Sequence, residues 1–260
     1  MSKVPVLPTD ADPWAALRQL TPARIALGRV GASLPTAEVL RFGVAHALAR
    51  DAVHTPLAVP SLVAALAAEG FPSLVVTSQA GDRTRYLMRP DLGRALDPAA
   101  EPVLRAQETP YDVALVVADG LSAIAVQRHA VALLVALRAR LNPALRVAPV
   151  VIATLARVAL GDEIGACLGA RLVVIALGER PGLSSPDSLS AYLTFQPRRG
   201  INDAQRNCVS NIHLGGLDYA QAAHTIAWLI TQALERCLTG IDLKDASETL
   251  ALYHHAPEKL

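Results

Sequence analysis

Three loops that follow predicted strands carry the residues best placed to bind a ligand. They comprise residues 119–122 (DGLS), 154–162 and 178–185 (GERPGLSS). Each loop follows a run of apolar residues that is typical of a buried parallel strand. Because the carboxyl ends of parallel strands meet at one edge of a sheet, we expect the three loops to be neighbours there. The sequence therefore predicts a ligand-binding site at this edge.

Glu179 lies at the end of the third of these strands, and its sequence context leaves two interpretations open. With the adjacent Arg180 it could form a solvated ion pair, which contributes less than ~1 kcal/mol. It could also accept hydrogen bonds from a polar ligand at the sheet edge. The loop itself could be a plain connector in which Ser185 and Pro186 begin the next turn.

A second polar segment, PRRGINDAQRNCVSNIH, surrounds Cys208. Its polar residues are Arg198, Arg199, Asn202, Asp203, Arg206, Asn207, Asn211 and His213. Such a segment is usually a surface loop, and Cys208 beside Val209 is most simply a small, partly buried apolar residue. No chemistry is assigned to it on these grounds alone.

Gly161, Gly165 and Gly169 recur at four-residue intervals in a predicted helix. Each glycine costs such a helix about 1 kcal/mol relative to alanine, so some other interaction must compensate. Close packing of the helix on a strand is the simpler explanation. A flat, bulky ligand lying on bare backbone is the alternative.

Metal and disulfide chemistry find little support in the residue pattern. His46, Arg50 and His54 share one side of a predicted helix, but no carboxylate completes a ligand set there, so a solvated polar face is expected. The three cysteines are far apart and form no CxxC pair, which argues against disulfides and structural zinc.

Several signatures of common ligand-binding and catalytic sites are missing from the sequence. It contains no GxGxxG, no GxxxxGK[ST], no GxSxG and no HExxH, so the usual dinucleotide, P-loop, hydrolase and zincin sites are not predicted. It also lacks the DxHxxG sequence by which one group of corrinoid proteins places a histidine on cobalt.

Composition sets the class of fold that must position these loops. The 260 residues are 52% hydrophobic, only 4% aromatic and 18% charged, with a net charge of +1. This excludes a disordered chain and gives no electrostatic case for binding nucleic acid. No run reaches the roughly 18 apolar residues of a membrane span, and the amino terminus lacks the apolar region of a signal peptide, so a cytosolic protein is expected.

The two halves of the chain differ in their periodicity. From Tyr111 onward, apolar strands alternate with amphipathic helices, one capped by Ser122 and the last by Asp218 with Gly240 as its left-handed C-cap. Before that, we expect helices near residues 36–54 and 60–69 and a β-hairpin formed by SLVVTSQ and RTRYLM. The predicted fold is α/β: a Rossmann-like domain with a mostly parallel sheet covered by helices, preceded by a smaller, mainly helical amino-terminal region with a hairpin.

Taken together, six segments give the chain a recognisable resemblance. They are LTPARIALGRVGASLPT, RFGVAHALARDAVH, DGLSA, ARVALGDEIGACLGA, LGERPGLSSPDSL and RNCVSNIH. The chain resembles the small subunit (light chain) of ethanolamine ammonia-lyase from about Leu20 to the region of Leu243. No single motif is generic, so the joint match is specific.

This resemblance implies a role in an adenosylcobalamin-dependent lyase that converts ethanolamine to acetaldehyde and ammonia by a radical mechanism. In that family a large subunit holds the substrate and the catalytic residues, and the small subunit, inactive alone, covers part of the cobalamin. The family's cofactor-binding positions correspond here to Val158, Glu179 and Cys208. The cofactor is expected base-on, with its own dimethylbenzimidazole on cobalt and no metal ligand from this chain.

The resemblance also suggests how the chain is divided between partners. Residues 1–10 are expected to be a flexible tail, residues 11–110 to contact the large subunit, and residues 111–260 to clasp the cobalamin. Some relatives carry a longer amino-terminal extension associated with packaging into bacterial microcompartments. The shorter start of this chain leaves both the open cytoplasm and a microcompartment as alternatives.

Two other functions remain to be weighed against this one. A stand-alone, doubly wound module that binds a nucleotide or small acid would need a phosphate loop after the first strand of the second half, where only Asp119-Gly120-Leu121-Ser122 stands. A purely structural subunit would tolerate changes at Val158 and Glu179 without loss of cofactor affinity. Fold alone does not decide among them.

Overall fold

The computed structural model describes residues 14–21, 23–107 and 110–247. The expected tail of residues 1–10 lies outside them. The helices are α1 (Thr36–His54), α2 (Val59–Ala68), α3 (Arg83–Met88), α4 (Glu101–Arg105), α5 (Ala123–Arg138), α6 (Leu160–Cys167) and α7 (Tyr219–Arg236). The strands are β1 (Ser73–Thr77), β2 (Tyr111–Ala118), β3 (Val150–Thr154), β4 (Ala170–Gly178), β5 (Leu189–Phe195) and β6 (Asn207–Ile212).

A single mixed sheet forms the centre of the molecule, with strand order β1-β3-β2-β4-β5-β6. The first four strands in that order are parallel, and β5 and β6 continue the sheet antiparallel. Residues 113–118 of β2 are all buried, as expected for a central strand covered on both faces. An α/β fold with a mostly parallel sheet is therefore confirmed.

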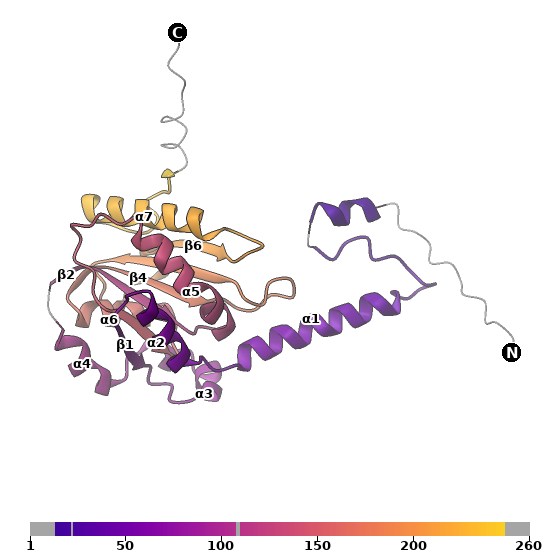
Figure 1. Ribbon diagram of the computed structural model, residues 1–260. Coiled ribbons are helices and arrows are strands. Elements are labelled where there is room, and N and C mark those ends of the chain that lie inside the picture. Colours follow the sequence, from indigo (N-terminus) through magenta and orange to yellow (C-terminus); the bar gives the residue numbers. More distant parts are fainter. Residues whose placement is uncertain (1–13, 22, 108–109, 248–260) are drawn as a thin grey trace, which may run out of the picture.

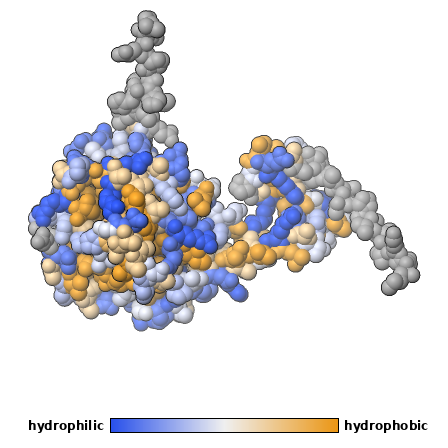
Figure 2. Space-filling model, viewed as in Figure 1, coloured by the Kyte–Doolittle hydropathy of each residue, from blue (hydrophilic) through white to orange (hydrophobic). Residues whose placement is uncertain are grey.

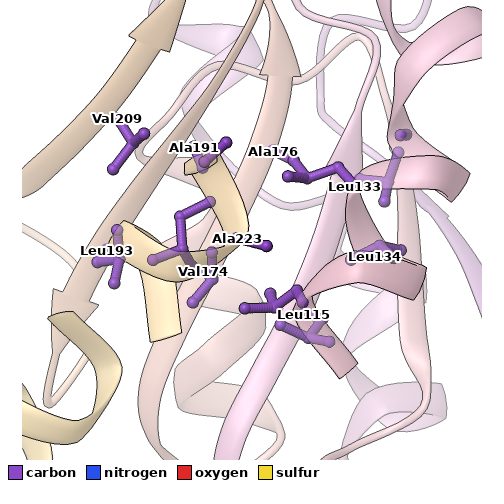
Figure 3. Packing of buried hydrophobic residues seen from close by; sticks show 14 of the residues in the cluster. Leu115, Leu133, Leu134, Val174, Ala176, Ala191, Leu193, Val209 and Ala223 are labelled. Atoms are coloured by element: carbon purple, nitrogen blue, oxygen red, sulfur yellow. The ribbon is translucent and has the colours of Figure 1, made fainter. Parts of the chain in front are cut away.

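Three helices, α2, α5 and α7, cover one face of the sheet and enclose the larger core (Figure 3). Leu133 and Leu134 of α5 pack toward Leu115 and Val174 of the sheet, and Ala223 of α7 lies over the β4 and β5 side. The predicted caps hold α5 and α7 in register. The Ser122 hydroxyl accepts a hydrogen bond from the Ala125 amide, and the Asp218 carboxylate accepts one from the Gln221 amide.

On the other face, α4 and α6 pack against β2, β3 and β4. A β-carbon at Gly161 would lie 3.1 Å from the Ile175 Cβ, and one at Gly165 would lie 2.7 Å from the Pro197 Cγ. Both glycines therefore let α6 approach the sheet closely, which is the simpler of the two explanations drawn from their spacing.

Helix α1 projects away from this body, and residues 14–21 and 23–34 lie at its far end (Figure 1). Its carboxyl end is attached to the body by the buried Ala52 and by the Val53 carbonyl, which accepts a hydrogen bond from Arg83 Nε at 2.8 Å. Figure 2 shows hydrophobic surface along the projecting helix. Its exposed large apolar residues are Val39, Leu40, Phe42, Val44 and Leu48.

The expected hairpin is wrong in its second half. SLVVT is indeed a strand, β1, but it pairs in parallel with β3 at the edge of the main sheet. RTRYLM is the helix α3, because the Asp82 carboxylate caps it by accepting from the Arg85 amide at 2.9 Å. The sheet thus extends across the boundary expected near residue 110.

Two features at the carboxyl-terminal end differ from expectation. Helix α7 ends at Arg236, and Cys237, not Gly240, takes the left-handed conformation at its C-cap. The segments LSAYLTF and NCVSNI are strands β5 and β6, which the sequence patterns did not single out.

No single helix among the described residues is long and apolar enough to cross a membrane. Helices α1 and α2 together reach that length and hydropathy but are bent by 82° where they join.

Candidate functional site

A cavity of about 700 Å³ opens at the carboxyl edge of the parallel strands. It lies where the strand order reverses, because β3 is on one side of β2 and β4 is on the other. Ligands of open α/β sheets bind at such a reversal point. Its lining residues are Tyr86, Pro90, Asp91, Arg94, Ala95, Leu121, Arg157, Val158, Ala159, Asp162, Glu163, Leu177, Gly178, Glu179, Tyr192, Arg199, Gly200, Ile201, Asn202, Asp203 and Arg206.

The three loops expected to converge do so through hydrogen bonds. The buried Asp119 carboxylate accepts from the amides of Leu155 and Ala156 at 2.9 and 3.0 Å, which joins the loops after β2 and β3. The Leu121 amide donates to the Gly178 carbonyl at 2.8 Å, which joins the loops after β2 and β4. Asp119 is therefore a structural link rather than a ligand-facing group, and burial raises its pKa against the opposing effect of those amides.

Glycine at the end of β4 is required by this convergence. A β-carbon at Gly178 would lie 1.9 Å from the Ser122 carbonyl oxygen, which no side chain could tolerate. Gly120 approaches Gly178 from the opposite loop with φ +55°, a conformation that favours glycine. The floor of the cavity at this point is therefore backbone.

Two of the three residues singled out by the family resemblance line the cavity. Val158, at the start of the turn into α6, is one of its apolar groups, and Glu179 follows the last residue of β4. Cys208, on β6, is exposed and does not line the cavity itself. It neighbours Tyr192, which does, because the two residues are register partners on β5 and β6.

Tyr192 connects the other two residues. Its hydroxyl donates to Glu179 Oε1 at 2.8 Å, and the same phenol interacts with the Cys208 thiol. Burial raises the pKa of the Cys208 thiol, the nearby Glu179 carboxylate raises it further, and the phenol acts in the opposite direction. The thiol is consequently neutral near pH 7.

One wall of the cavity is fixed by a buried ion pair between Arg206 and Asp162, whose side chains are 2% and 3% exposed. Arg206 also donates to the Ile201 carbonyl at 3.0 Å and to Asp203 Oδ1 at 2.9 Å. These bonds hold the loop before β6 against α6. A buried pair of this kind does little for net stability but costs several kcal/mol to break from one side.

The opposite wall is built on Tyr86 of α3. Its hydroxyl donates to the Ala156 carbonyl at 3.0 Å, and burial raises its pKa. The Arg157 and Arg83 guanidinium carbons lie 4.4 and 4.8 Å from the ring centroid, so both make cation–π contacts with the ring. The loop that carries Val158 is thereby held in place.

The charges lining the cavity nearly cancel. Five carboxylates (Asp91, Asp162, Glu163, Glu179 and Asp203) stand against four guanidinium groups (Arg94, Arg157, Arg199 and Arg206). Glu163 is already occupied by Arg199 through bonds of 2.8 and 3.1 Å. The site therefore favours a ligand with many neutral donors and acceptors over a phosphate or another concentrated charge.

The other sequence candidates lie elsewhere. His46, Arg50 and His54 lie on α1, away from the cavity, and no group of three or more potential metal ligands occurs within residues 14–21, 23–107 and 110–247. Ser185 and Pro186 lie in the connector between β4 and β5, which turns at residues 186–187 as expected, and the Pro186 carbonyl accepts a hydrogen bond from the Ser122 hydroxyl at 2.9 Å.

Sequence reasoning missed Tyr192, Tyr86 and the pairing of Arg206 with Asp162. A signal for Tyr192 exists in LSAYLTF, where Leu189, Ala191 and Leu193 alternate with more polar residues as in a strand. The pairing of Arg206 with a residue 44 positions earlier has no local signal.

The strand reversal and the cavity beside it define an α/β protein with the geometry of a ligand-binding site. Comparison with known proteins gives the family. A family model described as ethanolamine ammonia-lyase light chain (EutC) matches residues 11–244. The chain belongs to this family.

Curated relatives cover nearly the whole chain. A protein of Azotobacter vinelandii named ethanolamine ammonia-lyase small subunit is 53% identical over 251 residues, which is 94% of this chain and 93% of that protein. Proteins of the same name from Pseudomonas paraeruginosa and Pseudomonas syringae pv. tomato are 52% and 49% identical, over 95% of this chain and 92% and 88% of theirs. The family is thus one of lyase subunits.

Proposed function

We propose that this chain forms one side of a cobalamin site in an adenosylcobalamin-dependent ethanolamine ammonia-lyase and that a large subunit forms the other side. The observation that carries the proposal is the open cavity at the strand reversal, lined by Val158 and Glu179 and flanked by Cys208. Membership of the light-chain family indicates which reaction the complex carries out, and the cavity offers space for the cofactor.

The cavity fits the chemistry of a corrin. A corrin has a broad apolar face and neutral amide side chains around its rim, which need both donors and acceptors. Val158 offers apolar contact, and the nearly balanced carboxylates and guanidinium groups offer both kinds of polar partner. A whole cobalamin is larger than a cavity of about 700 Å³, so a second protein surface is needed to enclose it.

Each of the three family positions has a distinct role in this proposal. Val158 packs against the corrin, and the Glu179 carboxylate accepts hydrogen bonds from corrin amides. The neutral Cys208 thiol packs beside them without becoming a thiolate ligand. The cofactor is proposed to keep its own dimethylbenzimidazole on cobalt, as the resemblance to the family implies.

The large subunit is proposed to hold residues 11–110 mainly through α1. Large apolar side chains are exposed on more than one side of this helix: Leu40 and Phe42 are 64% and 48% exposed and lie on nearly opposite faces. Exposed large apolar residues gathered on one segment are typical of a protein interaction surface. The described part of this chain encloses only its carboxyl end, at Ala52.

The chain itself contributes binding rather than catalysis. When bound, adenosylcobalamin supplies the radical chemistry of the reaction. The residues around the cavity hold and orient the cofactor and shield it from water, whereas the substrate and the catalytic groups are assigned to the large subunit. We therefore expect no lyase activity from this chain alone.

The cavity gives little support to a stand-alone nucleotide-binding module. The loop after β2 would have to hold phosphate, but its Asp119 carboxylate already accepts two amides, and Gly120 and Leu121 pack against Gly178. The lining has no excess of positive charge.

The direct test is cofactor binding by the complex of this chain with its large subunit. Glu179→Gln removes the charge but keeps the shape, and we expect it to raise the Kd for cyanocobalamin roughly tenfold, since a hydrogen bond to a charged group is lost. Equilibrium dialysis measures this effect. Glu101→Gln on α4, whose side chain is 53% exposed and does not line the cavity, is the matched control and should bind as the unchanged complex does.

Two results would contradict the proposal. A large subunit that binds cobalamin and turns over ethanolamine equally well without this chain would remove the need for it. Equal affinities of the Glu179→Gln and Glu101→Gln complexes would show that the cavity is not where the cofactor lies.

A further inference from the structure

Tyr192 occupies a central place between two proposed cofactor contacts. The antiparallel register of β4, β5 and β6 puts it beside Ile175 on one strand and Cys208 on the other. Helix α6 packs on β4, and no helix among the described residues packs over Cys208, which is exposed. The phenol therefore lies half-buried where the helix layer ends and the cavity begins.

The position of the hydroxyl hydrogen decides which neighbour of Tyr192 accepts a hydrogen bond from it. A tyrosine hydroxyl has one hydrogen to donate and can accept in addition. The Tyr192 hydroxyl donates its hydrogen to Glu179 Oε1 at 2.8 Å, and it can turn toward Cys208 when the thiol ionises, which is why the phenol lowers the thiol pKa. The Tyr192 hydroxyl thus lies between the Glu179 carboxylate and the Cys208 thiol.

This arrangement leaves one oxygen of Glu179 for a ligand. Among the described residues, Tyr192 is the only side chain with a hydrogen bond to this carboxylate, and the bond is to Oε1. Oε2 is therefore the oxygen that can accept from a molecule in the cavity. Without the phenol, Glu179 would be a carboxylate on a loop beside Arg180, free to change rotamer and to pair with solvent.

We infer that Tyr192 is a positioning residue, which holds the Glu179 carboxylate and the Cys208 thiol in the orientation in which they meet the cobalamin. The inference rests on the proposed function, because it takes Glu179 and Cys208 to be cofactor contacts. Tyr192 acts through these two side chains, so its removal weakens binding by loss of preorganisation rather than by loss of a direct contact.

The first experiment is a cycle of substitutions in the two-chain complex, read by the Kd for cyanocobalamin. Tyr192→Phe should raise the Kd about fivefold to tenfold, as loss of one hydrogen bond does. Because Tyr192 acts in part through Glu179, the double variant with Glu179→Gln should lose clearly less affinity than the sum of the two single losses. Tyr111→Phe, the same chemical change at the amino end of β2, is the control and should leave the Kd unchanged.

A second measurement, the titration of the Cys208 thiol, tests how Tyr192 and Glu179 act on this group. The rate at which iodoacetamide alkylates Cys208, followed by peptide mass spectrometry over a range of pH, gives the titration of the thiol in the full chain. Tyr192→Phe removes the group that lowers the thiol pKa, so the midpoint should move to higher pH. Glu179→Gln removes the charge that raises it, so the midpoint should move to lower pH. A merely structural tyrosine would not produce opposite shifts.

The outcomes separate this inference from the proposed function. If Glu179→Gln weakens binding while Tyr192→Phe leaves both the Kd and the alkylation midpoint unchanged, Tyr192 has no positioning role and the cofactor site stands. If Glu179→Gln binds cobalamin as well as the unchanged complex, the proposed function is overturned, and this role for Tyr192 falls with it. Additive losses in the double variant would also overturn the inference.

Discussion

Helices α1 and α5 both contain many apolar residues, but those of α5 are largely buried and those of α1 are largely exposed. Helix α5 has 16 residues, and eight of them are buried between the sheet and α7. Helix α1 has 19 residues, and only Ala52 is buried (Figure 1). The body of the molecule, from α2 onward, encloses its own apolar surface, whereas α1 leaves its large apolar side chains exposed, and we propose that the large subunit covers them.

The arrangement of side chains explains the difference. In α5 the buried residues recur at three- and four-residue intervals, which gives one apolar face and one polar face. In α1 the large apolar residues are spread around the whole circumference. The first pattern suits a helix lying on a sheet, and the second suits a helix inserted into a partner.

The largest expected effect follows from removing the projecting helix. A chain that begins at Asp51 keeps Ala52 and Val53 on the body but loses the exposed apolar residues of α1. We expect association with the large subunit to weaken by more than about a hundredfold, because several large apolar contacts are lost together. The melting temperature of the isolated chain should change little.

Analytical ultracentrifugation of the mixed subunits and calorimetry of the shortened chain measure these two quantities. A shortened chain that still assembles with unchanged affinity would contradict the role proposed for α1, because the large subunit would then not bind this helix. Unfolding of the shortened chain would also contradict this role, because the body would then depend on α1 for its stability.

Two matched leucine substitutions, one on each helix, compare what a single side chain contributes to the free energy of unfolding. Leu133→Ala on α5, where the side chain is 1% exposed, should lower the free energy of unfolding by about 2–5 kcal/mol. Leu40→Ala on α1, where it is 64% exposed, should change that free energy by less than about 0.5 kcal/mol. Denaturant unfolding of the isolated chain gives both values.

The same two variants should show the reverse order of effects when the Kd for the large subunit is measured. Leu40→Ala is expected to raise the Kd for the large subunit about tenfold, whereas Leu133→Ala should leave it near the original value in conditions where the body stays folded. Similar effects of both variants on unfolding would contradict the assignment of α1 to an interface.

The smallest expected effect concerns charges. Asp112 accepts a hydrogen bond from the Arg146 amide at 3.0 Å and pairs with Arg171 at 3.0 Å, and these interactions hold its pKa below its usual range. A lowered carboxyl pKa contributes stability above the unfolded value of about 3.9, and this contribution is lost as the pH falls through the folded pKa. Asp112→Asn should therefore cost about 1 kcal/mol or less at pH 7 and nothing at about pH 2, because the pair is partly exposed.

The control for this measurement lies on α1. Asp51 is 3.7 Å from Arg50, and both side chains are more than 60% exposed, so Asp51→Asn should have no measurable effect at any pH. Unfolding curves from pH 2 to pH 7 compare the two. Equal effects of the two variants would show that the ion pairs of the body are no more ordered than those of α1.

The parts of the fold that could be predicted are those with a strong local pattern. The continuous apolar runs of β2, β3 and β4 and the Ser122 and Asp218 caps gave the parallel sheet and the helices α5 and α7. The rule that ligand sites form at the carboxyl ends of parallel strands then placed the cavity. These predictions needed no knowledge of which residues meet over long distances.

The parts that were missed depend on pairing between distant segments. RTRYLM has the composition of a strand, but Asp82 caps it as a helix and Tyr86 packs between two arginines. Strand β6 carries exposed polar residues because its outer face is open, so it has the composition of a surface loop. The contact of Tyr192 with Glu179 and Cys208 exists only once β4, β5 and β6 are paired.

The central claim is that this chain, and not the large subunit alone, surrounds the cofactor at the carboxyl edge of its sheet. Hydrogen–deuterium exchange of the two-chain complex, with and without cyanocobalamin, tests it most directly. We predict that cobalamin slows exchange in residues 155–163, 178–182 and 207–209, while the core of α5 and the helix α1 are unaffected. Protection confined to peptides of the large subunit, with no change in these three segments, would contradict the account.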